Sequence, residues 1–228
     1  MKYMVKYLDW DSNFFKIKVG ELIFDKLDFL IDFSNFDLIY IKSEQDFDLN
    51  LNDFKNSFSE TKAIFTKSPE KKDLSTKFIF SINEVENIVK DLYILAFESG
   101  KNSRFLLDKN FNNEKFKELY QIWIDNSISK IIADDVFVYV ENNKLLGFIS
   151  YKINDNNATV GLFAVDNNQQ GKGIGGKLLS HLENVLTEKN IKKLIISTQL
   201  SNIQSCKFYT KQGYQIEKKI YLKHYWKT

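Results

Sequence analysis

The spacing of apolar residues in the second half of the chain separates helical segments from extended ones. Apolar residues that recur every three or four positions predict amphipathic helices, whereas alternation with polar residues predicts strands. The predicted helices span residues 112–128, 174–188 and 202–211. The predicted strands span residues 136–140, 145–153, 158–165 and 193–198, followed by a final strand pair within 214–226. A strand that reaches the next strand through a helix favours parallel pairing, so the pattern predicts a mixed α/β fold.

The first half of the chain shows shorter alternating runs and one clear helical pattern. The alternating runs predict three strands, at residues 18–24, 37–42 and 61–66. Apolar residues at a period of about 3.6 predict a helix over residues 83–97. Small and polar residues at 99–102 end this pattern. We therefore predict two parts, a smaller α/β module over residues 1–100 and a larger domain over residues 101–228.

Composition and charge narrow the classes of function. The chain has 228 residues with 32 basic and 30 acidic side chains, and its net charge of +2 lacks the basic excess typical of nucleic-acid binding. One cysteine, Cys206, and two distant histidines exclude an internal disulfide and predict no metal site. No apolar run is long enough to span a bilayer. We expect a cytoplasmic protein without a nucleic-acid or membrane partner, and a homodimer is its candidate oligomer.

A glycine-rich loop, residues 170–176 (QGKGIGG), joins a predicted strand to a predicted helix. Glycine permits positive φ and a close approach of the backbone to a ligand, and the free N–H groups at a helix N-terminus attract anions. Lys172 and Lys177 add positive charge, so the expected ligand is a phosphate or pyrophosphate. The loop lacks the Gly-Lys-Ser/Thr of a P-loop, and no acidic residue follows where a dinucleotide ribose would need one. A glycine-rich helix start without a ligand is the structural alternative.

This loop resembles the signature of the GNAT superfamily of N-acetyltransferases. Gln170, Gly173 and Gly175 occupy the positions of its Gln/Arg-x-x-Gly-x-Gly/Ala motif, and Val165 stands where the preceding strand usually ends. The resemblance implies the GNAT fold, a central mixed and largely antiparallel sheet flanked by helices. It also implies acetyl-CoA as cosubstrate and no metal. Residues 101–228 would then be the acetyl-CoA-binding catalytic domain, and residues 1–100 would contribute to the substrate site.

The same resemblance assigns roles to the residues around the loop. The loop N–H groups would hold the CoA pyrophosphate, and the strand before the loop would pair with the pantetheine arm like an added strand. The implied cofactor-binding residues are Phe163, Ala164, Val165, Gln170, Gly171, Lys172, Gly173, Ile174, Gly175, Gly176, Asn202 and Ser205.

A second part of the family pattern follows the next strand. Asn202, Ser205 and Tyr209 fill three of its recurring positions. When an amine attacks a thioester, a thiolate leaves, and a phenol within hydrogen-bonding distance can protonate it. Tyr209 is therefore the predicted catalytic general acid, and an ordinary packed aromatic is the alternative.

The group that removes a proton from the amine is harder to find. Many relatives carry a Glu on the strand before the loop, but residues 158–165 contain no acid. A water relay or a residue from the N-terminal half would then serve. His181 is expected at the edge of a helix, and no argument from the sequence places His224. Cys206 has no adjacent histidine to activate it, and packing is its expected role.

A narrower resemblance concerns the acceptor. Residues 8–15 (LDWDSNFF), Ser103-Arg104-Phe105 with Asp108, and Thr198-Gln199 resemble the TDP-fucosamine acetyltransferase family, although Lys16 replaces a usual Gly. Those enzymes acetylate the 4-amino group of a dTDP-linked 4-amino-4,6-dideoxyhexose for surface polysaccharide, including lipopolysaccharide. The implied substrate residues are Trp10, Arg104, Phe105, Asp108 and Thr198.

The residue types suit a nucleotide-linked amino sugar. Arg104 could bind a diphosphate with two parallel hydrogen bonds, and Phe105 and Trp10 could stack on a base or sugar. The alternatives are a surface ion pair for Arg104 and core packing for the two aromatic residues. Another small amine, a peptide N-terminus or a non-catalytic acyl-CoA-binding module would also fit the fold, because fold alone does not decide function.

Overall fold

The computed structural model describes residues 5–24, 31–73 and 75–228. In these residues ten strands form one sheet in the order β1-β2-β3-β10-β4-β9-β8-β7-β6-β5. The strands are β1 (Lys6–Tyr7), β2 (Val19–Ile23), β3 (Leu38–Ser43), β4 (Phe54–Lys67), β5 (Ile79–Ser81), β6 (Asp135–Glu141), β7 (Lys144–Asn154), β8 (Asn157–Val165), β9 (Lys193–Gln199) and β10 (Gln215–Lys227). The helices are α1 (Asp9–Phe15), α2 (Val89–Ser99), α3 (Arg104–Leu107), α4 (Asn113–Ile128), α5 (Ile174–Glu188) and α6 (Ile203–Lys211), with 3-10 turns η1 (Ile82–Glu84) and η2 (Asn167–Gln169).

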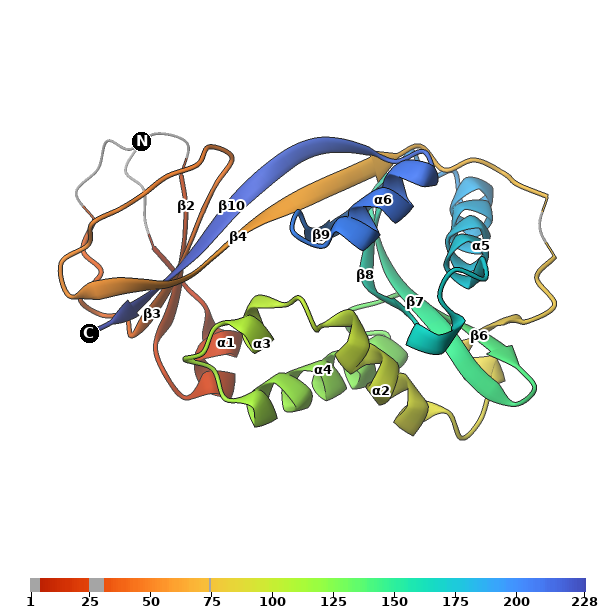
Figure 1. Ribbon diagram of the computed structural model, residues 1–228, viewed down its shortest axis with the longest axis horizontal. Coiled ribbons are helices and arrows are strands. Elements are labelled where there is room, and N and C mark those ends of the chain that lie inside the picture. The colour runs from red at the N-terminus through yellow and green to blue at the C-terminus, as the bar shows by residue number, and fades with distance from the viewer. Residues whose placement is uncertain (1–4, 25–30, 74) are drawn as a thin grey trace.

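The sheet is mixed and largely antiparallel. Two neighbouring pairs, β2 with β3 and β8 with β9, run parallel, and the other described pairs run antiparallel. β4 and β10 pair along nearly their whole length and connect the two ends of the molecule (Figure 1). Helices cover both faces of the sheet, which confirms the predicted mixed α/β fold.

Alternate residues of the strands enter different cores, as the period of two requires. In β6, Val136 and Val138 are buried in a cluster with side chains of α2 and α4. Phe137 and Tyr139 of the same strand are buried in a second cluster with α5 and α6. Full burial of each such side chain contributes roughly 1.5–3 kcal/mol to folding. The two cores fix α2 and α5 on opposite faces of the same strands, which positions the segments that form the site.

The prediction of two paired strands within residues 214–226 is wrong. One strand, β10, covers these residues and lies between β3 and β4 in the sheet. Its hydrogen-bonding partners come from the first half of the chain. Local alternation predicts an extended segment but does not show which distant strand completes its hydrogen bonds.

Two other boundaries differ from the prediction. β4 begins at Phe54 rather than near residue 61, because the exposed polar residues that follow Phe54 hide its alternation. α2 begins at Val89 rather than at residue 83, since Asn87 has a left-handed φ of 62° that a helix cannot contain. α2 lies against α4 and β8, and the division of the chain at residue 100 stays a prediction.

The parallel strands β8 and β9 diverge, and this opening positions the candidate site. In the described chain their pairing covers only Asn157 to Thr159 on β8. The register between β7 and β8 then shifts opposite Ser150, whose Oγ accepts a hydrogen bond of 2.8 Å from the Leu162 N–H. Such a bulge bends a strand and increases its twist. Beyond it, no described strand pairs with the edge of β8 that faces β9, as far as Val165.

Among the helices of the described chain, none combines the length and the apolarity that crossing a bilayer requires.

Candidate active site

A groove of about 340 Å³ lies between the end of β8, the glycine loop, α6 and the C-terminal end of α2. Tyr209 lines this groove together with most of the predicted cofactor-binding residues. Those residues are Phe163, Ala164, Val165, Gln170, Gly171, Gly173, Ile174, Gly175, Gly176, Asn202 and Ser205. Lys172 does not line the groove, and its Nζ donates a hydrogen bond of 2.8 Å to Oε1 of Gln169, which does line it.

The glycine loop leaves open space above its backbone. Gly171 and Gly173 have φ of 77° and 84°, a conformation that favours glycine, and a Cβ at either position would meet no atom within 4 Å. α5 begins directly after Gly173, so the N–H groups of its first turn face outward from the helix end. The helix dipole adds partial positive charge there. The loop therefore has the shape and the charge to bind a pyrophosphate.

Gln170 ties this loop to its neighbours. Its Nε2 donates hydrogen bonds of 3.1 Å to Val165 O and 3.0 Å to Asn167 Oδ1, which fixes the loop against the end of β8. Gln204 Nε2 donates a hydrogen bond of 2.7 Å to Gln170 Oε1 from α6. The motif glutamine thus holds β8, the loop and α6 in one arrangement.

Tyr209 lies at the inner side of the groove. Its side chain is buried among the rings of Phe65, Phe163 and Phe208, and burial raises the pKa of its phenol. The hydroxyl is therefore protonated at neutral pH, the form that a general acid requires. Asn202 Oδ1 accepts a hydrogen bond of 3.1 Å from Ser205 N and caps α6, the helix that carries Tyr209.

A second cleft, of about 560 Å³, adjoins the groove. It runs along β4 from Phe58 to Thr61, where the paired part of β9 has ended. Asn102, which follows α2, lines both the cleft and the groove. A molecule in the cleft would therefore lie next to a ligand in the groove.

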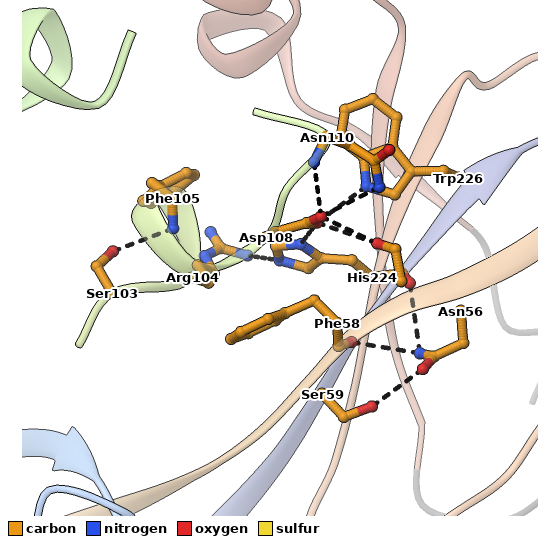
Figure 2. Close-up of polar contacts among 11 residues, drawn as sticks. Asn56, Phe58, Ser59, Ser103, Arg104, Phe105, Asp108, Asn110, His224 and Trp226 are labelled. Carbon is orange, nitrogen blue, oxygen red and sulfur yellow. Dashed lines mark hydrogen bonds and ion pairs between the residues drawn. The ribbon is translucent and has the colours of Figure 1, made fainter. Parts of the chain in front are cut away.

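α3 forms one wall of this cleft through Leu107, and the predicted substrate residue Arg104 lies one turn before it. Figure 2 shows Arg104 and Asp108 on either side of the His224 ring. Arg104 Nη1 lies 3.3 Å from His224 Nε2, and Asp108 Oδ2 lies 2.6 Å from His224 Nδ1. Because a guanidinium only donates, Nε2 accepts from Arg104 and the ring proton is on Nδ1, directed at Asp108.

The electrostatics of this network agree with a neutral histidine. The His224 side chain is fully buried, and burial lowers its pKa, so the ring stays uncharged at neutral pH. Burial by itself raises the pKa of Asp108, but hydrogen bonds from His224 and Trp226 outweigh that effect and keep the carboxylate ionised. Ser57 Oγ donates a further hydrogen bond of 3.1 Å to Asp108.

Arg104 is held from both sides. Its guanidinium carbon lies 4.0 Å from the centre of the Tyr40 ring and 4.4 Å from that of Phe105. Phe105 itself packs against Phe15 and Phe111 in the core. The guanidinium is thus fixed by stacking and by His224 before any ligand binds.

Arg104, Phe105 and Asp108 lie on or directly after α3 without lining the cleft, and the other two predicted substrate residues do not line it either. Trp10 on α1 is 45% exposed and stacks on Phe14, with 5.1 Å between the ring centres. Thr198 is buried in β9 opposite Ala63, and it lines neither the groove nor the cleft. Their roles toward a substrate stay predictions.

The structure adds residues that sequence patterns did not select. Glu60 lines the cleft, and His224 orients Arg104 although nothing in its sequence context places it there. The described residues contain no group of three His, Cys, Asp or Glu side chains suited to a metal ion. Burial raises the pKa of the Cys206 thiol, which disfavours the reactive thiolate.

The chain is similar in sequence to known proteins and in fold to solved structures. The protein "Spore coat polysaccharide biosynthesis protein SpsD" of Bacillus subtilis is 28% identical over 133 residues, which cover 58% of this chain and 45% of that protein. The chain spans about half the length of the curated relatives it matches.

Two solved structures share the fold. One is a protein from Novosphingobium aromaticivorans assigned to the GNAT acetyltransferases, with a TM-score of 0.59, 10% identity and coverage of 84% of this chain and 75% of that chain. The other is a functionally unknown conserved protein from Staphylococcus epidermidis, with a TM-score of 0.59, 12% identity and coverage of 92% and 85%.

The model of the acetyltransferase (GNAT) family matches residues 90–214. The match contains the glycine loop and Tyr209, and it agrees with the family resemblance inferred from the loop. Because it covers more than half of the 228-residue chain, the protein belongs to the acetyltransferase (GNAT) family.

Proposed function

We propose that this protein transfers the acetyl group of acetyl-CoA to the 4-amino group of a dTDP-linked 4-amino-4,6-dideoxyhexose, for surface polysaccharide biosynthesis. One observation carries the proposal. The groove beside Tyr209 meets, at Asn102, a second cleft, and α3, which lines that cleft through Leu107, also carries the stacked Arg104. Two adjoining sites suit a direct reaction between two bound substrates.

The groove fits acetyl-CoA in its shape and its hydrogen-bonding groups. The open edge of β8 at Phe163 to Val165 offers backbone groups to the amides of the pantetheine arm. The N-terminus of α5 offers N–H groups to the pyrophosphate, above Gly171 and Gly173, where an added Cβ would meet no atom of the described residues within 4 Å. This arrangement would direct the thioester toward the inner end of the groove, where Tyr209 lines it.

Tyr209 then serves as the general acid. The amine nitrogen forms a bond to the thioester carbon, the carbon–sulfur bond breaks, and the phenol donates its proton to the leaving thiolate. Its raised pKa keeps that proton available at neutral pH.

Arg104 supports an anionic acceptor. One N–H donor of the Arg104 guanidinium is directed at His224 Nε2. The remaining donors of the guanidinium can bind phosphate oxygens in parallel. The name of the Bacillus subtilis relative also refers to polysaccharide biosynthesis, although the alignment covers 45% of that protein. Tyr40 and Glu60 come from the first hundred residues, so the proposed N-terminal module would contribute to the acceptor site.

Acetyl transfer to another small amine or to a peptide N-terminus is the nearest alternative, and a non-catalytic acyl-CoA-binding module is a second one. A panel tests all three: dTDP-linked amino sugars, peptides and polyamines are each incubated with acetyl-CoA and scored for free thiol. The proposal predicts the fastest release with a dTDP-4-amino sugar. Faster release with a peptide or polyamine would reject the sugar, and tight acetyl-CoA binding without release would reject the enzyme.

A further inference from the structure

Glu60 places a carboxylate without hydrogen bonds in the wall of the acceptor cleft. Its side chain is 5% exposed, and neither carboxylate oxygen has a hydrogen-bond partner among the described residues. The ammonium of Lys62, at 3.8 Å from Oε1, is its ion-pair partner. A buried carboxylate without hydrogen bonds costs folding free energy, so its presence calls for an explanation in function.

The position of Glu60 is suited to proton transfer. It lies on β4, in the stretch that lines the cleft, and that cleft meets the acetyl-CoA groove at Asn102. Leu222 of β10 pairs with Glu60 of β4 on one side and with Lys42 of β3 on the other. An amine that enters the cleft on its way to the thioester would pass this carboxylate.

The charged groups around Glu60 are mostly cationic. Lys62 lies two residues after Glu60 on β4, and Arg104 and Lys42 interact electrostatically with Lys62. The negative charge of Glu60 contributes to the raised pKa of the Tyr120 phenol on α4. Burial lowers the pKa of the Lys62 ammonium, and the Glu60 carboxylate opposes that effect. These cations place positive charge around the Glu60 carboxylate.

Other candidates for a proton acceptor are already engaged or lie outside. Glu98 accepts a hydrogen bond of 2.6 Å from Asn167 near the glycine loop. Asp46 is 71% exposed and pairs with Lys223. Both ring nitrogens of His224 are used by Asp108 and Arg104, and β8 carries no acidic residue. Of the carboxylates that line the groove or the cleft, Glu60 is the buried one without a hydrogen bond.

We propose that Glu60 is the general base that takes a proton from the acceptor's ammonium, directly or through one water. This inference rests on the proposed acetyl transfer. The ammonium gives one proton to the Glu60 carboxylate and becomes a neutral amine. The amine nitrogen bonds to the acetyl carbon as the carbon–sulfur bond breaks, Tyr209 protonates the sulfur, and the second nitrogen proton returns to Tyr209. Glu60 releases its proton to solvent, so the products are amide, thiol and one proton.

The test is Glu60→Gln, which keeps the size of the side chain and removes the base. With acetyl-CoA and the amine of the panel on which the wild type is fastest, kcat/KM should fall about 100-fold at pH 7. At pH 9.5 the loss should shrink to less than about 10-fold, because more of the amine is already neutral in solution. The Kd of acetyl-CoA should stay within about twofold, since Glu60 is outside the groove.

Glu44→Gln is the matched control, because Glu44 is 61% exposed and pairs with Lys218 on the surface. It should keep wild-type kcat/KM at both pH values. A loss in Glu60→Gln that is the same at pH 7 and pH 9.5 would indicate a structural role and overturn the inference, as would an unchanged kcat/KM. A wild type inactive on every amine would reject the proposed function instead.

Glu60→Asp covers the case in which the amide variant does not fold. It keeps the charge one methylene further back, so it should fold, lose about 10-fold in kcat/KM at pH 7 and keep the wild-type pH profile. Wild-type kcat/KM in Glu60→Asp would reject a positioned base.

Discussion

Asp108 Oδ2 lies 2.6 Å from His224 Nδ1, although the two residues are 116 positions apart in the chain. This bond joins α3 to β10 and sets the tautomer of the ring, so that Nε2 faces the Arg104 guanidinium. Trp226 Nε1 donates to the same carboxylate oxygen at 3.0 Å. A charged side chain at the proposed acceptor site is therefore oriented by a buried histidine that does not itself face the acceptor.

Arg104→Lys should weaken acceptor binding while leaving acetyl-CoA binding unchanged. Lysine offers a point charge in place of the planar fork, and it loses the stacking between Tyr40 and Phe105. We expect the KM for the dTDP-amino sugar to rise roughly 10-fold, the change that loss of one charged hydrogen bond produces. Initial rates at saturating acetyl-CoA measure this, and calorimetry measures acetyl-CoA affinity. A rise in the Kd of acetyl-CoA with an unchanged acceptor KM would contradict this role.

The buried His224 should make the protein less stable in mild acid. Burial lowers the pKa of His224 from 6.5 to about 4 in the folded state, so the unfolded chain binds the proton more readily. The neutral ring contributes stability that is fully present above pH 6.5 and is lost as the pH falls toward 4. A fully buried group with this difference corresponds to about 3 kcal/mol. Urea unfolding at pH 7.5 and pH 4.5 measures it.

His224→Gln is the comparison for that measurement, because glutamine does not titrate. The variant should be less stable at pH 7.5, yet lose less free energy of unfolding between pH 7.5 and pH 4.5 than the wild type. An equal loss in both proteins would assign the acid sensitivity to other groups.

Much of the second half of the fold could be predicted from local pattern. α5 has the predicted bounds, because its apolar residues recur on one face between a glycine loop and a polar end. The β6–β7 hairpin also follows its sequence, since Asn142 and Asn143 adopt φ of 51° and 59° and asparagine tolerates this conformation. The groove could be located for the same reason, as its loop, strand and helix are consecutive in the chain.

The acceptor side could not be located in this way. Glu60 lies in β4 before the segment that alternation predicts as a strand, and His224 lies in a strand whose partner was not predicted. Glu60 lines the cleft, and His224 orients Arg104 beside it, because β10 pairs with β3 and β4, strands from the first half of the chain. Such contacts depend on sheet order, which no local periodicity encodes.

Tyr209→Phe should lower turnover while acetyl-CoA binding holds. The variant loses only the hydroxyl and keeps the ring between Phe65 and Phe163. Without a proton donor for the thiolate, kcat should fall by about tenfold or more. Thiol release at saturating substrates measures kcat. The control variant must lie outside the groove, which Phe208 lines. Tyr93→Phe removes an exposed hydroxyl instead and should leave kcat unchanged. Unchanged turnover in Tyr209→Phe would leave the protein without its assigned acid.

Gly173→Val should abolish acetyl-CoA binding without unfolding the protein. A valine at this position would be strained, because a φ of 84° favours glycine. Its side chain would also occupy the open space above the N-terminus of α5, where the pyrophosphate would bind. Calorimetry should show the Kd of acetyl-CoA rising at least about 100-fold. Gly213→Val separates the two effects, because Gly213 has a similar φ of 86° but does not line the groove. Both variants should lose a comparable amount of stability, of order 1–3 kcal/mol, whereas only Gly173→Val should lose binding. If Gly173→Val bound acetyl-CoA as the wild type does, the loop would not hold the pyrophosphate, and the assignment of the groove would fail with it.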